Sequence, residues 1–147
     1  MMVTRLWRGL VWLARTAVLA ALQAAPKPVA HLAVHSFTPI LKGRERRVDL
    51  GLLYDPRRAP EKALALELRA SLQTLAPDLR LRRNYPYRGT SDGLPTWLRR
   101  QFKAEDYAGL ELELNQADWN PASQAWQSLD RLLTQALETV FAELIHN

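Results

Sequence analysis

Apolar residues recur along the chain with two different periods, and these periods alternate from one segment to the next. Segments that are apolar throughout, or that alternate apolar with polar residues, predict strands at residues 29–35, 48–54, 79–84 and 109–115. Segments with apolar residues three and four positions apart predict helices at residues 5–22, 60–75, 94–102 and 122–145. The polar segment 36–47 predicts a loop, and Asn120 with Pro121 is a typical start for the last helix.

Strands that alternate with helices are typical of an α/β fold. We therefore predict a three-layer sandwich in which helices cover both faces of a largely parallel, mixed sheet. The chain contains no internal repeat and no linker, so we expect a single domain over residues 1–147, with an N-terminal helix within 1–25 and a C-terminal helix within 121–145. In sheets of this kind, ligands bind beyond the carboxyl ends of the strands.

Composition narrows the class of protein and of partner. The chain has no cysteine, which excludes disulfides and thiolate metal sites and fits a cytoplasmic protein. Its net charge of +5 comes largely from scattered arginines with no interleaved aromatic residues, so nucleic-acid binding is the least favoured alternative. Arg15 interrupts the apolar N-terminal segment, so we expect no membrane span, although the following LQAAPKP keeps export open as an alternative.

Two histidines lie on the first predicted strand. His31 and His35 share a face, but four residues along a strand separate them by about 13 Å, which is too far for both to bind one zinc ion. His35, at the end of the strand, is the better placed metal ligand. The alternative is a hydrogen-bonded histidine at the edge of a sheet.

The last predicted strand carries carboxylates on one face. Glu111, Glu113 and Asn115 alternate with three leucines, so their side chains point to one side of the sheet. A carboxylate at a strand end is what a hydrolase needs to deprotonate an attacking water. The alternative is a solvated or salt-bridged sheet face.

The loop NYPYRG (84–89) gathers two tyrosines, an asparagine and an arginine around a proline. Arg88 is suited to bind a substrate carboxylate through two parallel hydrogen bonds, and Tyr87 is suited to donate to a developing oxyanion. The alternative is an ordinary loop whose tyrosines pack onto the sheet.

Taken together, these segments resemble a known family. VHSFTP (34–39), VDLGLLYDPRR (48–58), RRNYPYRGTSDGL (82–94) and GLELELNQ (109–116) look like successive blocks of the zinc-dependent N-formylglutamate amidohydrolases. The resemblance is strongest over residues 31–116 and covers the C-terminal half of that family. It implies a truncated zinc-carboxypeptidase-like fold and a small N-acylated substrate, similar to N-formylglutamate, whose formyl or acyl amide is cleaved.

The resemblance also implies roles for particular residues. His35 would be a ligand of a Zn²⁺ cofactor, and Glu113 would be the general base. Asn84, Tyr87 and Arg88 would face the substrate. We further expect His35 and Glu113 to point into the same cleft, without His31.

Two hypotheses about function follow. In the first, the chain is a truncated or incomplete hydrolase, because the residues before the VHSFTP strand contain no histidine, aspartate or glutamate. Besides His35 the chain then offers at best Asp49 or Asp55, whereas a catalytic zinc uses three ligands. This hypothesis predicts self-association or a missing N-terminal half, and no hydrolysis at an enzymatic rate by the chain alone. In the second, the chain is a non-catalytic α/β module that binds an acidic metabolite or a protein partner as a soluble monomer.

Overall fold

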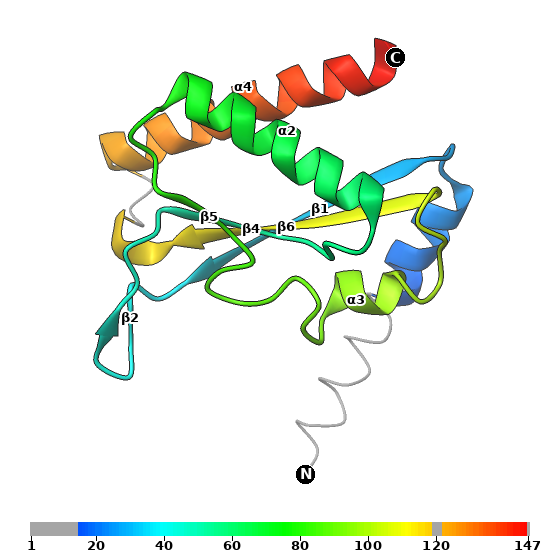
Figure 1. Cartoon of the computed structure of the whole chain (residues 1–147), viewed down its shortest axis with the longest axis horizontal. Coiled ribbons are helices and arrows are strands. Elements are labelled where there is room, and N and C mark those ends of the chain that lie inside the picture. Colours follow the sequence, from blue (N-terminus) through cyan, green and yellow to red (C-terminus); the bar gives the residue numbers. More distant parts are fainter. Residues whose placement is uncertain (1–14, 119–121, 147) are drawn as a thin grey trace.

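The computed structural model describes residues 15–118 and 122–146 (Figure 1). Its strands are β1 (Val29–Phe37), β2 (Ile40–Leu41), β3 (Arg44–Glu45), β4 (Leu50–Leu53), β5 (Leu81–Arg83) and β6 (Tyr107–Asn115). Its labelled helices are α2 (Ala59–Leu75), α3 (Leu94–Leu98) and α4 (Gln124–His146), with a 3₁₀ turn at Gln116–Asp118. Residues 15–24 are also helical.

Four of the strands form one sheet in the order β1-β6-β4-β5. β1 is parallel to β6 and β4 is parallel to β5, whereas β4 runs antiparallel to β6. β6, the last of these strands in the sequence, therefore lies inside the sheet and joins two parallel pairs. This arrangement confirms the predicted α/β class with a mixed sheet, while β2 and β3 form a separate hairpin.

The core lies between one face of this sheet and two helices. Leu110, Leu112 and Leu114 alternate along β6, and all three are buried against this helical layer. Helix α2 meets them with leucines that recur every four residues, and α4 lies beside α2 on the same face (Figure 1). The other buried members of the core cluster are Leu50, Leu52, Tyr54, Leu64, Ala65, Leu68, Leu72, Ala136 and Val140.

The opposite face of the sheet has a smaller helical cover. α3 lies on this side, below the sheet in Figure 1. The helical residues 15–24 lie beside it, with the guanidinium of Arg15 5.9 Å from the ring centre of Trp97. Helices therefore flank both sides of the sheet, but the second layer is short. Within the described residues, no helix combines the length and apolarity needed to cross a membrane.

All four predicted strands are present with slightly shifted ends, as are the described parts of the predicted helices. The prediction of a loop was wrong for residues 40–45, which contain the β2–β3 hairpin, because strands of two residues carry no apolar period. Helix α3 ends at Leu98 rather than at residue 102. The predicted helical residues 5–14 lie outside the described residues.

The start of α4 also differs from the prediction. Asn120 and Pro121 lie outside the described residues. The helix begins after Ser123, whose hydroxyl accepts a hydrogen bond of 3.1 Å from the backbone nitrogen of Trp126. This is the usual bond of a serine N-cap.

Candidate functional site

The face of the sheet turned away from α2 and α4 carries the polar side chains of β1 and β6. Side chains alternate along a strand, so the odd-numbered residues of both strands share this face. The parallel register pairs His35 with Glu113, and Glu111 lies two residues earlier on β6. The structure therefore brings His35 and Glu113 together on adjacent strands and adds Glu111 to them.

These three side chains form the centre of the candidate site. His35 Nε2 lies 3.7 Å from Glu111 Oε2, and the side chain of His35 is 54% exposed. Glu113 is only 6% exposed, and its Oε2 atom has no hydrogen-bond partner within the described residues. A buried carboxylate oxygen without a partner destabilises the folded state, so its presence calls for an explanation such as a catalytic role.

Burial raises the pKa of both glutamates above their ordinary value. At Glu113 the charge on His35 opposes this rise in pKa, and the charge on Glu111 adds to it. A carboxylate with a raised pKa is a stronger base than an exposed one. The pair is therefore suited to take up a proton from a water molecule.

The loop at residues 84–89 crosses β4 on this same face of the sheet. A Cβ atom added to Gly51 would lie 2.0 Å from the carbonyl oxygen of Tyr85, and one added to Gly89 would lie 2.1 Å from the backbone nitrogen of Tyr54. Only glycine permits such close approach of two backbones. Gly51 is also the register partner of Glu113 on β6, so the loop lies next to the proposed base.

Asn84 holds the shape of this loop. Its φ of 51° is a left-handed conformation that asparagine tolerates better than most residues. Its side-chain oxygen accepts hydrogen bonds from the backbone nitrogens of Tyr54 at 3.1 Å and Gly89 at 3.0 Å. Asn84 therefore has a structural role, and its expected contact with substrate stays a prediction.

Tyr87 pairs with an arginine that the sequence analysis did not single out. Arg46 Nη1 donates to the hydroxyl of Tyr87 at 3.3 Å, and the guanidinium of Arg46 also lies 5.7 Å from the ring centre of Phe37. The charge on Arg46 acts to lower the pKa of Glu113. A largely buried cation held in this way is suited to bind a carboxylate of a substrate.

Arg88 lies at a different place from Tyr87. It lines a cavity of about 450 Å³ whose lining also includes Asp55 and Asn84 but neither His35 nor Glu113. The loop residues predicted to bind substrate are thus divided between two places on the molecule.

His31 has a partner of its own. Its Nδ1 atom lies 2.8 Å from the hydroxyl oxygen of Tyr107, which is buried. Burial lowers the pKa of His31, and the charge on Arg99 lowers it further. His31 shares a sheet face with His35 but lies four residues away along β1, so it does not join the candidate site.

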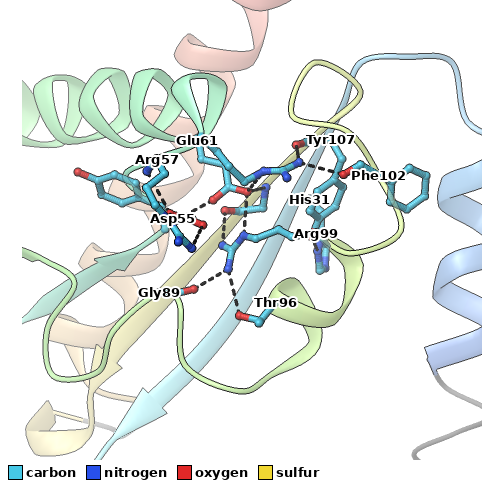
Figure 2. A network of polar contacts seen from close by, with 12 residues as sticks. His31, Asp55, Arg57, Glu61, Gly89, Thr96, Arg99, Phe102 and Tyr107 are labelled. Carbon is cyan, nitrogen blue, oxygen red and sulfur yellow. Dashed lines mark hydrogen bonds and ion pairs between the residues drawn. The ribbon is translucent and has the colours of Figure 1, made fainter.

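A buried cluster of ion pairs lies toward the start of β6, around Glu61 at the beginning of α2 (Figure 2). Glu61 is fully buried. Its Oε1 accepts a hydrogen bond from the backbone nitrogen of Gly109 at 3.1 Å, and its Oε2 accepts one from that of Asp55 at 2.8 Å. β4 ends at Leu53, so this carboxylate bridges the two backbones where the ladder between β4 and β6 stops.

Two arginines complete this cluster. Arg99 Nε lies 2.9 Å from Glu61 Oε1, and Arg58 Nε lies 3.2 Å from the same oxygen. Arg99 also donates to the carbonyl oxygen of Gly89, and Arg58 to that of Tyr107. The cluster therefore ties α2, α3 and β6 to the end of the loop that crosses the sheet.

The polar residues of the site do not form a metal centre by themselves. Among the described residues, no group of three or more histidine, aspartate or glutamate side chains could hold a metal ion. Asp49 and Asp55, the carboxylates at the two ends of β4, form ion pairs with Arg80 and Arg57. Since a catalytic zinc uses three protein ligands, the described residues leave such a site incomplete.

Arg46 and Glu61 were missed by the sequence analysis for the same reason. Arg46 belongs to an arginine-rich turn and Glu61 to the first turn of a helix, and both are ordinary places for exposed charges. For Glu61 the sequence offers one signal, the glycine at position 109, because a glycine within a strand often marks a close approach or an irregular ladder.

Comparison with known proteins gives two findings. The family described as N-formylglutamate amidohydrolase matches residues 14–119, and no curated protein matches the chain. The chain is similar to the crystal structure of a gene product from Agrobacterium tumefaciens, with 29% identity and a TM-score of 0.60. That match covers 86% of this chain and 49% of the other, so the chain spans about half the length of the solved structure.

Proposed function

Because this chain belongs to the N-formylglutamate amidohydrolase family, we propose that it supplies the general base and part of the substrate pocket of a hydrolase. The substrate is an N-formylated or N-acylated acidic amino acid, such as N-formylglutamate. In this proposal the sheet is part of a zinc-carboxypeptidase-like fold that the chain represents in part. The single observation that carries the proposal is the buried, unpartnered oxygen of Glu113 beside His35.

Glu113 acts as the base in the proposed reaction. Its carboxylate takes a proton from a water molecule while the oxygen of that water attacks the amide carbon. The carboxyl group then returns the proton to the amide nitrogen as the carbon–nitrogen bond breaks, which releases formate and the free amino acid. The raised pKa of Glu113 supports both transfers, because it brings the group closer to the pH at which the reaction runs.

Arg46 and Tyr87 bind the substrate in this proposal. Arg46 is largely buried and held by two aromatic rings, so its guanidinium is oriented before a ligand arrives. An acidic amino acid offers carboxylates that match this guanidinium. Tyr87, 44% exposed, is available to donate a hydrogen bond from its hydroxyl.

The role of zinc in this proposal rests only on the resemblance to the family. His35 is the donor that the family resemblance assigns to it, and His35 lies at the exposed end of the site. The described residues do not complete a set of three ligands, so we derive no step through the metal. We propose instead that the site becomes complete only with further residues, in agreement with the half-length match.

The incomplete set of zinc ligands among the described residues also favours a second function, binding without cleavage. Arg46 and Tyr87 are in place whether or not a metal binds, so the chain has the features of a module that binds an acidic metabolite without cleaving it. Formate release from N-formylglutamate, with zinc supplied, separates the two functions. The purified 147-residue chain is expected to release no formate above the buffer rate.

The decisive measurement uses a complemented protein. We define the complementing half as the part of the Agrobacterium tumefaciens gene product that this chain leaves uncovered, produced together with the chain. We expect formate release from this mixture, and Glu113→Gln should lower its rate by on the order of 10²- to 10⁴-fold. The exposed Glu105→Gln is the matched control and should leave the rate unchanged. Equal rates for both variants would remove Glu113 as the base, and N-formylglutamate binding without formate release would favour the binding module.

A further inference from the structure

β1 is the long, unpaired edge of the sheet. It has nine residues and pairs only with β6. The opposite edge, β5, has three residues, two of which are arginines. Short and charged edge strands protect a sheet against further pairing. β5 has this protection, and β1 does not.

The backbone of β1 offers a row of free hydrogen-bonding groups. The backbone nitrogen of Val29 donates to the carbonyl oxygen of Asp106, so the odd-numbered residues of β1 turn their backbone groups toward β6. Because these groups alternate along a strand, those of Ala30, Leu32, Val34 and Ser36 point outward. Within the described part of the chain, none of these four amides donates to another backbone carbonyl.

The side of β1 that faces the helical layer is also partly uncovered, although Leu32 packs against the core. Val34 is 56% exposed although it is a large apolar residue within a strand. A cavity of about 320 Å³ lies between Val34, Leu112 and α4 residues that include Trp126 and Leu133. A second cavity, of about 480 Å³, lies between Ala30, α2 and Phe141 of α4. The layer formed by α2 and α4 therefore stops short of β1.

The size of the similar solved structure indicates what covers this edge. The match covers 49% of that structure, so the similar protein has further residues that are available to cover an edge of the shared part. On the described residues, β1 combines free backbone groups, an uncovered apolar side and adjacent cavities. His35, the most exposed member of the candidate site, lies on the same strand.

We propose that β1 is an interior strand of the working protein. Its partner is an α/β polypeptide like the complementing half, which pairs a strand with the outward groups of β1 and packs an apolar helix into the two cavities. This inference concerns assembly and does not depend on the proposed reaction.

The test is the mass and the hydrogen exchange of the chain with the complementing half. We expect a one-to-one complex by light scattering. Amide exchange at residues 30, 32, 34 and 36 should slow about tenfold or more in the complex, because each amide gains a hydrogen bond. Exchange at residues 31, 33 and 35 should change far less, because these amides already pair with β6.

Two variants at one position test the edge itself. Val34→Pro removes an outward amide and leaves the ladder with β6 intact, and Val34→Lys places a charge on the uncovered face. Both should prevent the complex while the far-ultraviolet circular dichroism of the chain stays unchanged. Leu75→Lys is the control, because Leu75 is an exposed apolar residue at the end of α2.

Three outcomes would overturn the inference: no complex, a complex in which the four amides exchange as before, or a dimer of the chain that the complementing half does not displace. A complex without formate release would support the inference and contradict the proposed function. Formate release by the monomeric chain alone would overturn the inference. It would support hydrolysis as the function and contradict only the expectation that further residues complete the site.

Discussion

Two buried glutamates, Glu61 in the first turn of α2 and Glu113 on β6, differ in how many partners their carboxylates have. Glu61 accepts hydrogen bonds from two backbone nitrogens and contacts two arginines. Glu113 lies further along β6, and one of its oxygens has no partner within the described residues. The chain therefore satisfies a buried charge fully at one end of β6 and leaves another unsatisfied at the other end.

The difference separates the structural role of Glu61 from the functional role that we propose for Glu113. Every contact of Glu61 joins parts of the fold, so the network leaves it no capacity for a ligand. Glu113 keeps an oxygen without a partner among the described residues and a raised pKa, and both destabilise the folded state, which is why we propose it as the base. Buried charge alone does not identify an active site, whereas a buried charge without a partner does point to one.

The largest expected effect concerns Glu61. Glu61→Ala leaves Arg58 and Arg99 without their shared carboxylate and should lower the free energy of unfolding by about 3–5 kcal/mol. Glu113→Ala should lower it far less, because no described hydrogen bond is lost at Oε2. Urea unfolding of both variants measures the contrast. Equal losses of stability would mean that the two carboxylates have the same role.

A smaller effect is expected at the floor of the site. Gly51→Ala places a Cβ atom against the carbonyl oxygen of Tyr85, so the crossing loop has to shift, at a cost of about 1–3 kcal/mol. Gly93→Ala is the control, since its Cβ meets nothing closer than 3.9 Å. Thermal unfolding should separate the two variants. If they melt at the same temperature, the loop is not held against Gly51 in solution.

The smallest effect is a dependence on pH. Because burial raises the pKa of Glu113 in the folded state, the folded chain holds this proton at pH values where the unfolded chain has released it. The free energy of unfolding therefore falls as pH rises above the ordinary value of 4.5. Glu113→Gln should remove this fall and stabilise the chain at neutral pH. Glu105→Gln should follow the parent chain at every pH, and a Glu113→Gln curve that also follows the parent would show that Glu113 titrates normally.

The elements of the fold could be predicted from the sequence, but their order in the sheet could not. Leucines every four residues place α2 on the core, and the alternation in β6 separates its leucines from its glutamates. Both patterns are local. The antiparallel pairing of β4 with β6 depends on how the connections cross the sheet, and the spacing of apolar residues along the chain does not predict those connections.

The candidate site was predictable to the same extent. The shared face of His35 and Glu113 could be predicted because side chains alternate along each strand, whereas their roles as ligand and base stay predictions. Arg46 could not be predicted, because its burial depends on Phe37 and Tyr87 closing over it from separate segments. The role of Glu61 could not be predicted, because its carboxylate bridges β4 and β6 only where the hydrogen-bond ladder between them ends, and the sequence does not show where that is.

The late position of β6 also governs how the chain reaches this fold. Val29 pairs with Tyr107, and Leu50 with Leu114. Neither β1 nor β4 can therefore pair with β6 until that strand has been synthesised, long after both of them. Of the sheet, only the pairing of β4 with β5 can form on the ribosome before β6 emerges. Contacts so distant in sequence slow folding, because a long loop has to close before they form. During that interval β1 is exposed along both edges, and unpaired strand edges make a nascent chain prone to aggregation.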